Sequence, residues 1–254
     1  MAIIAVFNQK GGVGKTTTSL NLAAALAQRR QRPLAIDLDP QAHLSAMSGV
    51  TVATGLESIY GFYKESKPLV GLVKQLPSGG SLIPSHFELS KVDALFGRGP
   101  RIVNRLNAGI REEKLEQADV PILIDCCPML NVLSLNAIFA AGKVLVPVSA
   151  DYLALKGALQ LENTLKALEH VLKKRVERRY LITRYDARRK MARDILAQMR
   201  ERFGSELCDT RIAENVSLAE SLAYSQDVFA HAPHSAGAKD YDSLLDELMD
   251  INFI

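Results

Sequence analysis

The 254-residue sequence has few cysteines and no long apolar run. Its three cysteines, Cys126, Cys127 and Cys208, form neither a C-x-x-C pair nor the spaced set of a disulfide framework, which predicts a protein of the reducing cytoplasm. No apolar run approaches the roughly 20 residues of a membrane-spanning helix. Met1 and Ala2 lead straight into an apolar segment, without the basic region and cleavage site of a secretory signal. We therefore expect a soluble, cytoplasmic protein.

Internal repeats and low-complexity tracts are also absent. Hydrophobic residues make up 48% of the chain and charged residues 23%, proportions that suit a globular protein with a sizeable core. A chain of this length is typical of one large α/β domain or two small ones. We expect a single domain over residues 1–254.

A glycine-rich loop follows the first apolar run, residues 3–7, and precedes a helix-forming segment, residues 19–26. Strand, glycine loop and helix together bind phosphate, because backbone N–H groups face the oxyanion and the helix N-terminus adds about half a positive charge. Lys15 would reach the β- and γ-phosphates, and the Thr16 hydroxyl would bind Mg²⁺. The predicted nucleotide-binding residues are Lys10, Gly11, Gly12, Val13, Gly14, Lys15, Thr16 and Thr17.

This loop departs from the common pattern G-x-x-x-x-G-K-[ST]. Gln9 stands where that pattern has its first glycine, and an additional lysine, Lys10, precedes the glycine pair. Two cations so close together require a highly charged ligand, which favours a polyphosphate such as ATP. A flexible glycine turn without a ligand is the alternative, but the flanking strand and helix favour a phosphate site.

In these residues the chain resembles the ParA/MinD class of P-loop ATPases, whose deviant Walker A box has the second lysine. Its small ParA-like (Soj-like) members are the most similar. The resemblance implies ATP and Mg²⁺ as cofactors and an ATP-dependent sandwich homodimer. It also implies that Lys10 reaches across to the phosphates of the partner subunit. Lys10, Lys15 and Asp39 are the catalytic residues that it indicates.

Two carboxylates follow the next apolar run, which starts at Leu34. Asp37 and Asp39 lie at its end, and open α/β sheets bind ligands at the carboxyl ends of their strands. Capping of the following helix is the alternative role for either residue. By resemblance, residues 37–41 match the second box of the family, in which Asp39 positions the attacking water and couples hydrolysis to the dimer.

A further apolar run, residues 120–124, ends at Asp125. Continuous apolar runs are typical of parallel strands that are buried on both faces. Asp125 is therefore the candidate Walker B residue that holds Mg²⁺ through water, with helix capping as the alternative. The family usually continues with one residue and two prolines, whereas Cys126-Cys127-Pro128 keeps only one proline.

The remaining segments alternate between strand-like and helix-like patterns, which predicts a parallel, right-handed, doubly wound α/β sheet with helices on both faces. The resemblance covers nearly the whole chain and places residues 212–215 beside the adenine, although Ala213 replaces a usual proline. The predicted strands are 81–85, 143–148, 180–183 and 208–212, and the predicted helices are 101–118, 153–172 and 187–203.

Positive charge is concentrated between residues 173 and 202. This segment has twelve Lys or Arg and four Asp or Glu, a local balance of +8, so the rest of the chain carries −5 of the net +3. On the helix expected after Asp186, Arg189, Arg193 and Arg200 fall within 40° of one another at about 100° per residue, while Met191, Ile195, Met199 and Phe203 form a separate apolar line for the core.

Such a basic stripe opposite a buried face is typical of a surface that contacts the DNA backbone. A solvated helix face is the alternative. Resemblance to ATPases that coat DNA favours non-specific DNA binding. Many relatives, however, carry arginines near positions 217 and 234–236, where this chain has Ser217 and His234-Ser235-Ala236. The contacts would then come mainly from Arg189, Arg193 and Arg200.

The C-terminal segment distinguishes branches of the class. MinD-like members end in a basic amphipathic helix that docks on membranes. Residues 240–250 are acidic here, and anionic lipid would repel them. We expect no membrane partner.

The leading functional hypothesis is a ParA-like ATPase that positions a cargo on the nucleoid: a plasmid, a chromosome locus or a protein assembly. A ParB-like protein or a cargo adaptor would stimulate slow hydrolysis and release it. A redox or maturation protein resembling the nitrogenase iron protein is one alternative, and it requires cysteines that hold an iron–sulfur cluster between two subunits. A small-molecule P-loop ligase or kinase is the other.

Overall fold

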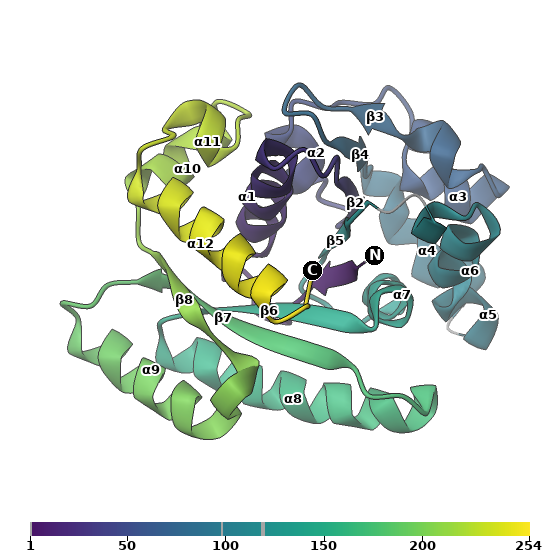
Figure 1. Cartoon of the computed structure of the whole chain (residues 1–254). Coiled ribbons are helices and arrows are strands. Elements are labelled where there is room, and N and C mark those ends of the chain that lie inside the picture. Colours follow the sequence, from purple (N-terminus) through teal and green to yellow (C-terminus); the bar gives the residue numbers. More distant parts are fainter. Residues whose placement is uncertain (1, 98, 118–119) are drawn as a thin grey trace.

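One sheet of eight strands runs through the centre of this computed structural model, which describes residues 2–97, 99–117 and 120–254 (Figure 1). All neighbouring strands are parallel except β3 and β4, so the predicted doubly wound, mainly parallel α/β fold is confirmed. In spatial order the strands are β3 (Lys74–Gln75), β4 (Ser81–Ile83), β2 (Leu34–Leu38), β5 (Ile122–Cys126), β1 (Ile3–Val6), β6 (Lys143–Ser149), β7 (Glu177–Tyr185) and β8 (Leu207–Ala213).

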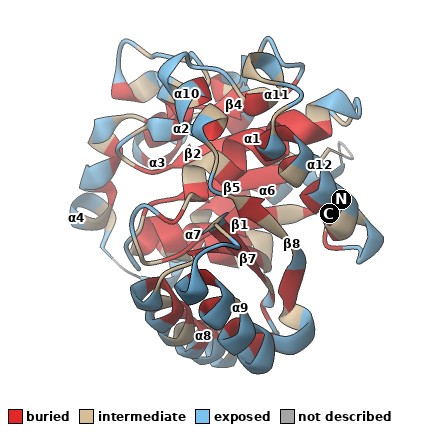
Figure 2. Cartoon of the chain, turned by 90° about the vertical axis from the view of Figure 1, so that its left-hand side faces the viewer, coloured by how far each residue is buried: buried red, intermediate tan, exposed pale blue. Residues whose placement is uncertain are grey.

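The apolar runs form strands because both faces of the sheet are covered. Ile4 packs into one hydrophobic cluster and the next residue, Ala5, into another on the opposite face. Leu123 and Ile124 of β5 divide in the same way. A parallel strand buried on both sides needs apolar residues at every position rather than at alternate ones. Figure 2 shows the strands buried at the centre of the molecule.

Helices cover both faces of this sheet (Figure 1). The first face is covered by α1 (Lys15–Gln28), α2 (His43–Met47), α10 (Val216–Ala223), α11 (Val228–His231) and α12 (Ala236–Asp250). The second face is covered by α3 (Ile59–Glu65), α4 (Val92–Phe96), α5 (Pro100–Val103), α6 (Arg105–Glu112), α7 (Val132–Ala141), α8 (Tyr152–Leu172) and α9 (Lys190–Phe203). Short 3₁₀ turns span Gly55–Glu57, Leu69–Leu72, Phe87–Lys91, Leu115–Gln117 and Gly204–Glu206.

Two predicted helices differ from the structure. The segment 101–118 divides into α5, α6 and a 3₁₀ turn, because Asn104 and Lys114 leave the helical conformation; Lys114 has φ 55°. Its last residue, Ala118, lies outside the described residues. The segment 187–203 begins to be helical only at Lys190, because a turn in which Arg189 N–H donates to the Asp186 carbonyl (3.0 Å) precedes α9.

The predicted apolar line of α9 is only partly buried. Ile195, Met199 and Phe203 are buried as expected, but Met191 is 58% exposed and Ala192 takes its place in the core.

None of the described helices is both long and apolar enough to cross a membrane.

Candidate nucleotide site

Four neighbouring strands end at one edge of the sheet, and each continues into residues of the candidate site. The glycine loop follows β1, Asp37 and Asp39 come from β2, Asp125 from β5 and Asp151 from the end of β6. Parallel register brings them together, since Asp125 pairs with Val6 on one side and with Asp37 on the other. The sheet therefore gathers the predicted loop and both predicted carboxylate segments at one place.

The backbone of the glycine loop adopts a conformation that is strained for residues with a side chain. Gly12 and Gly14 have φ 75° and 88°, a conformation that glycine adopts readily. Gly14 is also the N-cap of α1 and provides no side-chain hydrogen bond, which leaves the N–H groups of the first turn without a side-chain cap. The Thr183 hydroxyl anchors the loop by donating to the Val13 carbonyl (2.8 Å). This is an anion site made of backbone.

Lys15 turns into the loop that it follows. Its Nζ donates to the Lys10 carbonyl oxygen (3.0 Å), and the residue is only 7% exposed. Burial lowers the pKa of its ammonium, while the nearby Asp125 and Asp39 carboxylates act in the opposite direction. A buried cation at an uncapped helix N-terminus is suited to a phosphate chain.

Asp125 is fully buried and receives two hydroxyl hydrogen bonds. The Thr16 Oγ1 donates to its Oδ2 (2.8 Å) and the Ser19 Oγ to its Oδ1 (2.8 Å). Burial raises the pKa of Asp125 to about 6, although these hydrogen bonds and Lys15 favour the charged form. A threonine hydroxyl beside a carboxylate provides the hard oxygen ligands that Mg²⁺ prefers, so these residues fit the predicted metal.

Asp37 lies opposite Asp125 in the sheet and is also fully buried. Its carboxylate accepts hydrogen bonds from Ser45 N–H (2.9 Å), the Ser45 hydroxyl (2.7 Å) and Asp39 N–H (3.1 Å). Burial, together with the charge of Asp125, raises the pKa of Asp37 to about 7. When two buried carboxylates face each other, ionising both costs free energy because their charges repel. A cation bound between these carboxylates and a phosphate would lower that cost.

Asp39 stands where β2 gives way to the following turn. It is 7% exposed, and its Oδ1 accepts a hydrogen bond from Gln41 N–H (2.9 Å). Its charge acts on both Lys15 and Asp125, which places it within electrostatic range of the loop. Asp37 fixes the backbone of Asp39 through a hydrogen bond. The two predicted strand-end aspartates therefore differ in their contacts.

Lys10 points away from its own loop toward the end of β6. Its Nζ lies 2.5 Å from Asp151 Oδ1, and the two side chains are 29% and 42% exposed. Asp151 is also the N-cap of α8, accepting from Ala154 N–H (2.9 Å) and from the Ser149 hydroxyl (2.6 Å). Burial would raise the pKa of Asp151, but the hydrogen bonds from Lys10 and Ser149 outweigh it and hold that pKa below its ordinary value.

Asp151 was not predicted from the sequence. A sequence pattern could have indicated it, because Asp151 follows the predicted strand 143–148. The carboxyl ends of parallel strands carry ligand-binding groups. Asn8 was also missed: its side chain accepts from Lys10 N–H (3.0 Å) and donates to the Pro147 carbonyl (2.8 Å), which ties the loop to β6.

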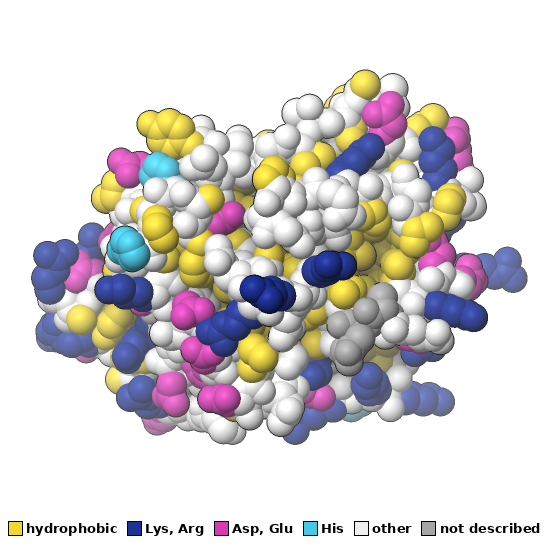
Figure 3. Space-filling model, turned by 45° about the horizontal axis from the view of Figure 1, so that its top comes forward, with side chains coloured by type: hydrophobic (Ala, Val, Ile, Leu, Met, Phe, Trp, Pro, Cys, Tyr) yellow, Lys and Arg dark blue, Asp and Glu magenta, His cyan; other side chains and the backbone are white. Residues whose placement is uncertain are grey.

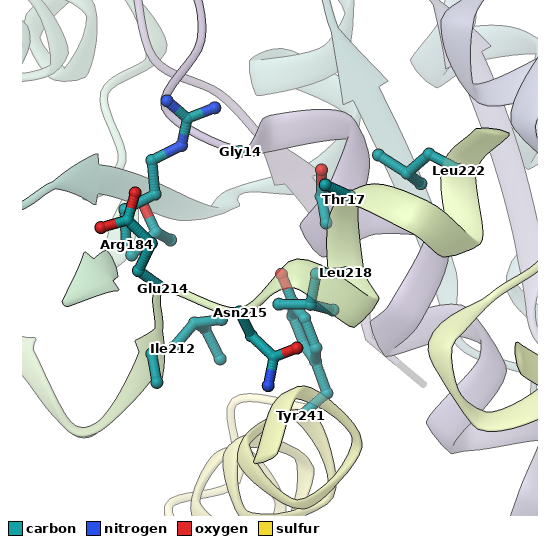
Figure 4. Close-up of a pocket in the computed structure, with 12 residues that line it drawn as sticks. Gly14, Thr17, Arg184, Ile212, Glu214, Asn215, Leu218, Leu222 and Tyr241 are labelled. Carbon is teal, nitrogen blue, oxygen red and sulfur yellow. The ribbon is translucent and has the colours of Figure 1, made fainter. Parts of the chain in front are cut away.

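A cavity of about 330 Å³ adjoins the start of α1 (Figure 4). Thr17 faces it from α1, Tyr241 from α12, and Leu218 and Leu222 from α10. The segment 212–215 forms another wall of this cavity, and its expected place beside the adenine stays a prediction. Mixed apolar and polar walls of this size suit the base and sugar of a nucleotide.

The three arginines predicted to bind DNA lie on or next to α9, but they do not all belong to the helix and their contacts differ. Arg189 precedes the helix as its N-cap and pairs with Glu214 (3.0 Å). Arg193 donates to the Ala187 (2.7 Å) and Arg188 (3.0 Å) carbonyls, and Arg200 lies 3.8 Å from Asp209. All three are exposed. Figure 3 shows Lys and Arg side chains gathered at the edge of the molecule where β7 connects to α9.

Fold and site together define a P-loop nucleotide-binding protein with a second lysine ahead of its glycine loop. A family model described as an AAA domain matches residues 1–178. The chain belongs to this family and, within it, to the ParA/Soj group of P-loop NTPases.

Three relatives carry that assignment. The chromosome-partitioning ATPase Soj of Thermus thermophilus is 38% identical over 97% of this chain and 94% of its own length. The chromosome partitioning protein ParA of Caulobacter vibrioides is 34% identical, over 98% and 94%. The sporulation initiation inhibitor protein Soj of Bacillus subtilis is 32% identical, over 97% of each chain.

Solved structures agree on the fold. Cobyrinic acid a,c-diamide synthase from Mycobacterium smegmatis, with bound ADP and magnesium, is 27% identical, with a TM-score of 0.83 over 98% of this chain and 94% of that chain. Apo McdA from Cyanothece has a TM-score of 0.86 at 21% identity, over 98% and 99%. The cell division ATPase MinD of Pyrococcus furiosus has a TM-score of 0.78 at 22% identity, over 98% and 99%.

Proposed function

We propose that this chain is a ParA-like ATPase that positions a cargo. Mg²⁺ and ATP bind at the glycine loop and bring two chains together as a sandwich dimer, which binds DNA without regard to sequence. A ParB-like protein or a cargo adaptor then stimulates hydrolysis and releases the dimer. The protein would act in the cytoplasm, associated with the nucleoid.

The different orientations of the two loop lysines are the observation that supports this proposal most strongly. Lys15 is buried within its own loop, whereas the ammonium of Lys10 lies at the rim on Asp151 and is partly exposed. Lys15 is therefore placed for the phosphates of its own chain. Lys10 can leave Asp151 to reach phosphates presented by a second chain without disturbing Lys15.

The remaining residues take their roles from the same geometry. The backbone of residues 11–17 cradles the phosphates, and Thr16 and Asp125 hold Mg²⁺, directly or through water. Mg²⁺ supplies charge neutralisation at the phosphates. Asp39 orients the attacking water, because it is a carboxylate near the loop whose hydrogen bond comes from Gln41 N–H, with none from Thr16 or Lys15 among the described residues. Related structures with bound ADP or ATP analogue and magnesium support these cofactors.

DNA binding is proposed for Arg189, Arg193 and Arg200 with the neighbouring β7–α9 connection. Two of these arginines have carboxylate neighbours, Glu214 and Asp209, at exposed positions. Exposed ion pairs contribute about 0–1 kcal/mol, so a phosphate backbone can replace them at little cost. Backbone contacts carry no base code, which predicts binding without sequence preference.

The experiment that tests the proposal measures DNA binding and ATP turnover together. We expect duplex DNA of unrelated sequences to bind equally well with Mg-ATP and weakly with Mg-ADP. If about six phosphates are neutralised per dimer, log K should fall against log salt with a slope of about −5. Lack of binding by the ATP-bound protein at low salt would refute the DNA step.

A small-molecule P-loop ligase is the second candidate, because the M. smegmatis diamide synthase is 27% identical over nearly the whole chain. Such an enzyme would hydrolyse ATP in response to a small acceptor and not in response to DNA. Stimulation by DNA and a partner protein distinguishes the two. The iron–sulfur alternative is disfavoured by geometry, because Cys126 and Cys127 are only 1% and 2% exposed and cannot bridge to a second chain as placed.

A further inference from the structure

A second hollow lies where β1, β5 and β6 begin, at the opposite end of the sheet from the glycine loop. Its volume is about 610 Å³, against about 330 Å³ for the cavity beside the loop. Ala2 and Ile254, which are far apart in the sequence, both line this hollow near the markers of the two ends (Figures 1 and 2). Pro121 lines it from the start of β5, and residues 30–32 from the connection after α1.

Three basic side chains line this hollow, beside the last residue of the chain, Ile254. Arg30, Arg32 and Lys143 all line it, and neither guanidinium has a hydrogen-bond or ion-pair partner in the described part of the chain. Lys143 Nζ is held in place by the carbonyls of Asn252 (2.9 Å) and Phe253 (3.3 Å). The Glu177 carboxylate lies 3.8 Å from that ammonium. Cations that outnumber the carboxylates around a concave surface attract a counter-ion.

The two arginines occupy backbone positions that suit glycine better. Arg30 has φ 61° and Arg32 has φ 46°. Arg30 follows the C-cap of α1, Arg29: its N–H donates to the Ala27 carbonyl (2.9 Å), and Gln31 N–H donates to the Leu26 carbonyl (3.1 Å). This is the helix ending in which glycine is most common, because side chains strain the left-handed conformation. Neither guanidinium forms a hydrogen bond or ion pair, within the described residues, that would offset this strain.

We propose that this hollow is a binding site for a small anion that carries two or more phosphate groups. Paired guanidinium groups match phosphate oxygens with two parallel hydrogen bonds, and Lys143 adds a third cation. The volume lies in the range of small-molecule sites and exceeds what one phosphate needs. The site is separate from the glycine loop, and the inference does not depend on the function proposed above.

Pyrophosphate is the probe that tests this site, titrated by calorimetry into the full chain that is already saturated with Mg-ADP at fixed free Mg²⁺. We expect one binding event per chain. The double variant Arg30→Gly/Arg32→Gly should weaken it by at least about 100-fold, since each charge-assisted contact contributes roughly a factor of 10 or more. The double variant should fold, with a melting temperature equal to or above that of the native chain, because glycine relieves both left-handed residues.

Lys173→Gly is the matched control. Lys173 is a basic residue with φ 51° at the end of α8, so this change removes one positive charge and the same kind of strain away from the hollow. It should leave pyrophosphate binding within about twofold. Native-like affinity in the double variant would place pyrophosphate outside this hollow and overturn the proposal. Failure of the native chain to bind, or loss of duplex DNA binding instead of pyrophosphate binding in the double variant, would also overturn it.

Discussion

Replacing Asp151 by asparagine should make ATP-dependent dimerisation easier. The substitution removes the charge that holds Lys10 at 2.5 Å, while asparagine is as good an N-cap as aspartate for α8. Lys10 is then no longer ion-paired within its own chain. If it acts on the nucleotide of a second chain, the dimer forms without first breaking this pair.

The size of the effect follows from the exposure of the pair. The two side chains are 29% and 42% exposed, so solvent screening limits the pair to about 0.4–1 kcal/mol. That corresponds to a factor of roughly 2–5 per chain. A symmetric dimer gives up two such pairs, so its dissociation constant should fall by roughly 4- to 25-fold.

Sedimentation equilibrium with a non-hydrolysable ATP analogue measures this constant. Asp227→Asn is the control, because Asp227 caps α11 through Phe229 and Ala230 N–H groups and lies on another element. It should leave dimerisation unchanged. A weaker dimer in the Asp151→Asn variant would show that Asp151 acts in the dimer itself, and the reasoning about Lys10 would be wrong.

Three further predictions concern the loop, the metal and the DNA surface. Lys15→Ala should abolish ATP binding in equilibrium dialysis, because it removes the buried cation of the loop; retained affinity would contradict its role. Burial raises the pKa of Asp125 to about 6, and the metal needs its ionised form, so Mg-ATP affinity should be constant above that pH and fall by about tenfold per unit below it. A flat profile from pH 5 to 8 would exclude Asp125. Glu in place of Arg189, Arg193 and Arg200 should eliminate DNA binding in filter assays and leave ATP-driven dimerisation intact, whereas an unchanged salt slope would locate the site elsewhere.

The glycine loop and the carboxylates were predictable because each is a local pattern at the end of an apolar run. Asp125 needed only residues 120–124 before it, and parallel strands then placed it beside Asp37. The Lys10–Asp151 pair was not predictable, since it joins residues 141 positions apart and depends on the order of β1 and β6 in the sheet. The same limit applied to α9, where one turn, closed by Asp186, shifted the start of the helix to Lys190.

Sedimentation of the Asp39→Ala variant with Mg-ATP tests the central claim most directly. This variant loses the carboxylate proposed to orient water but keeps Lys10, Lys15, Thr16 and Asp125, so ATP should persist. We expect a stable dimer with ATP, a monomer with ADP, and a monomer that still binds ATP once Lys10→Ala is added. An Asp39→Ala protein that remains monomeric with bound ATP, or a Lys10→Ala/Asp39→Ala protein that dimerises as well, would contradict it.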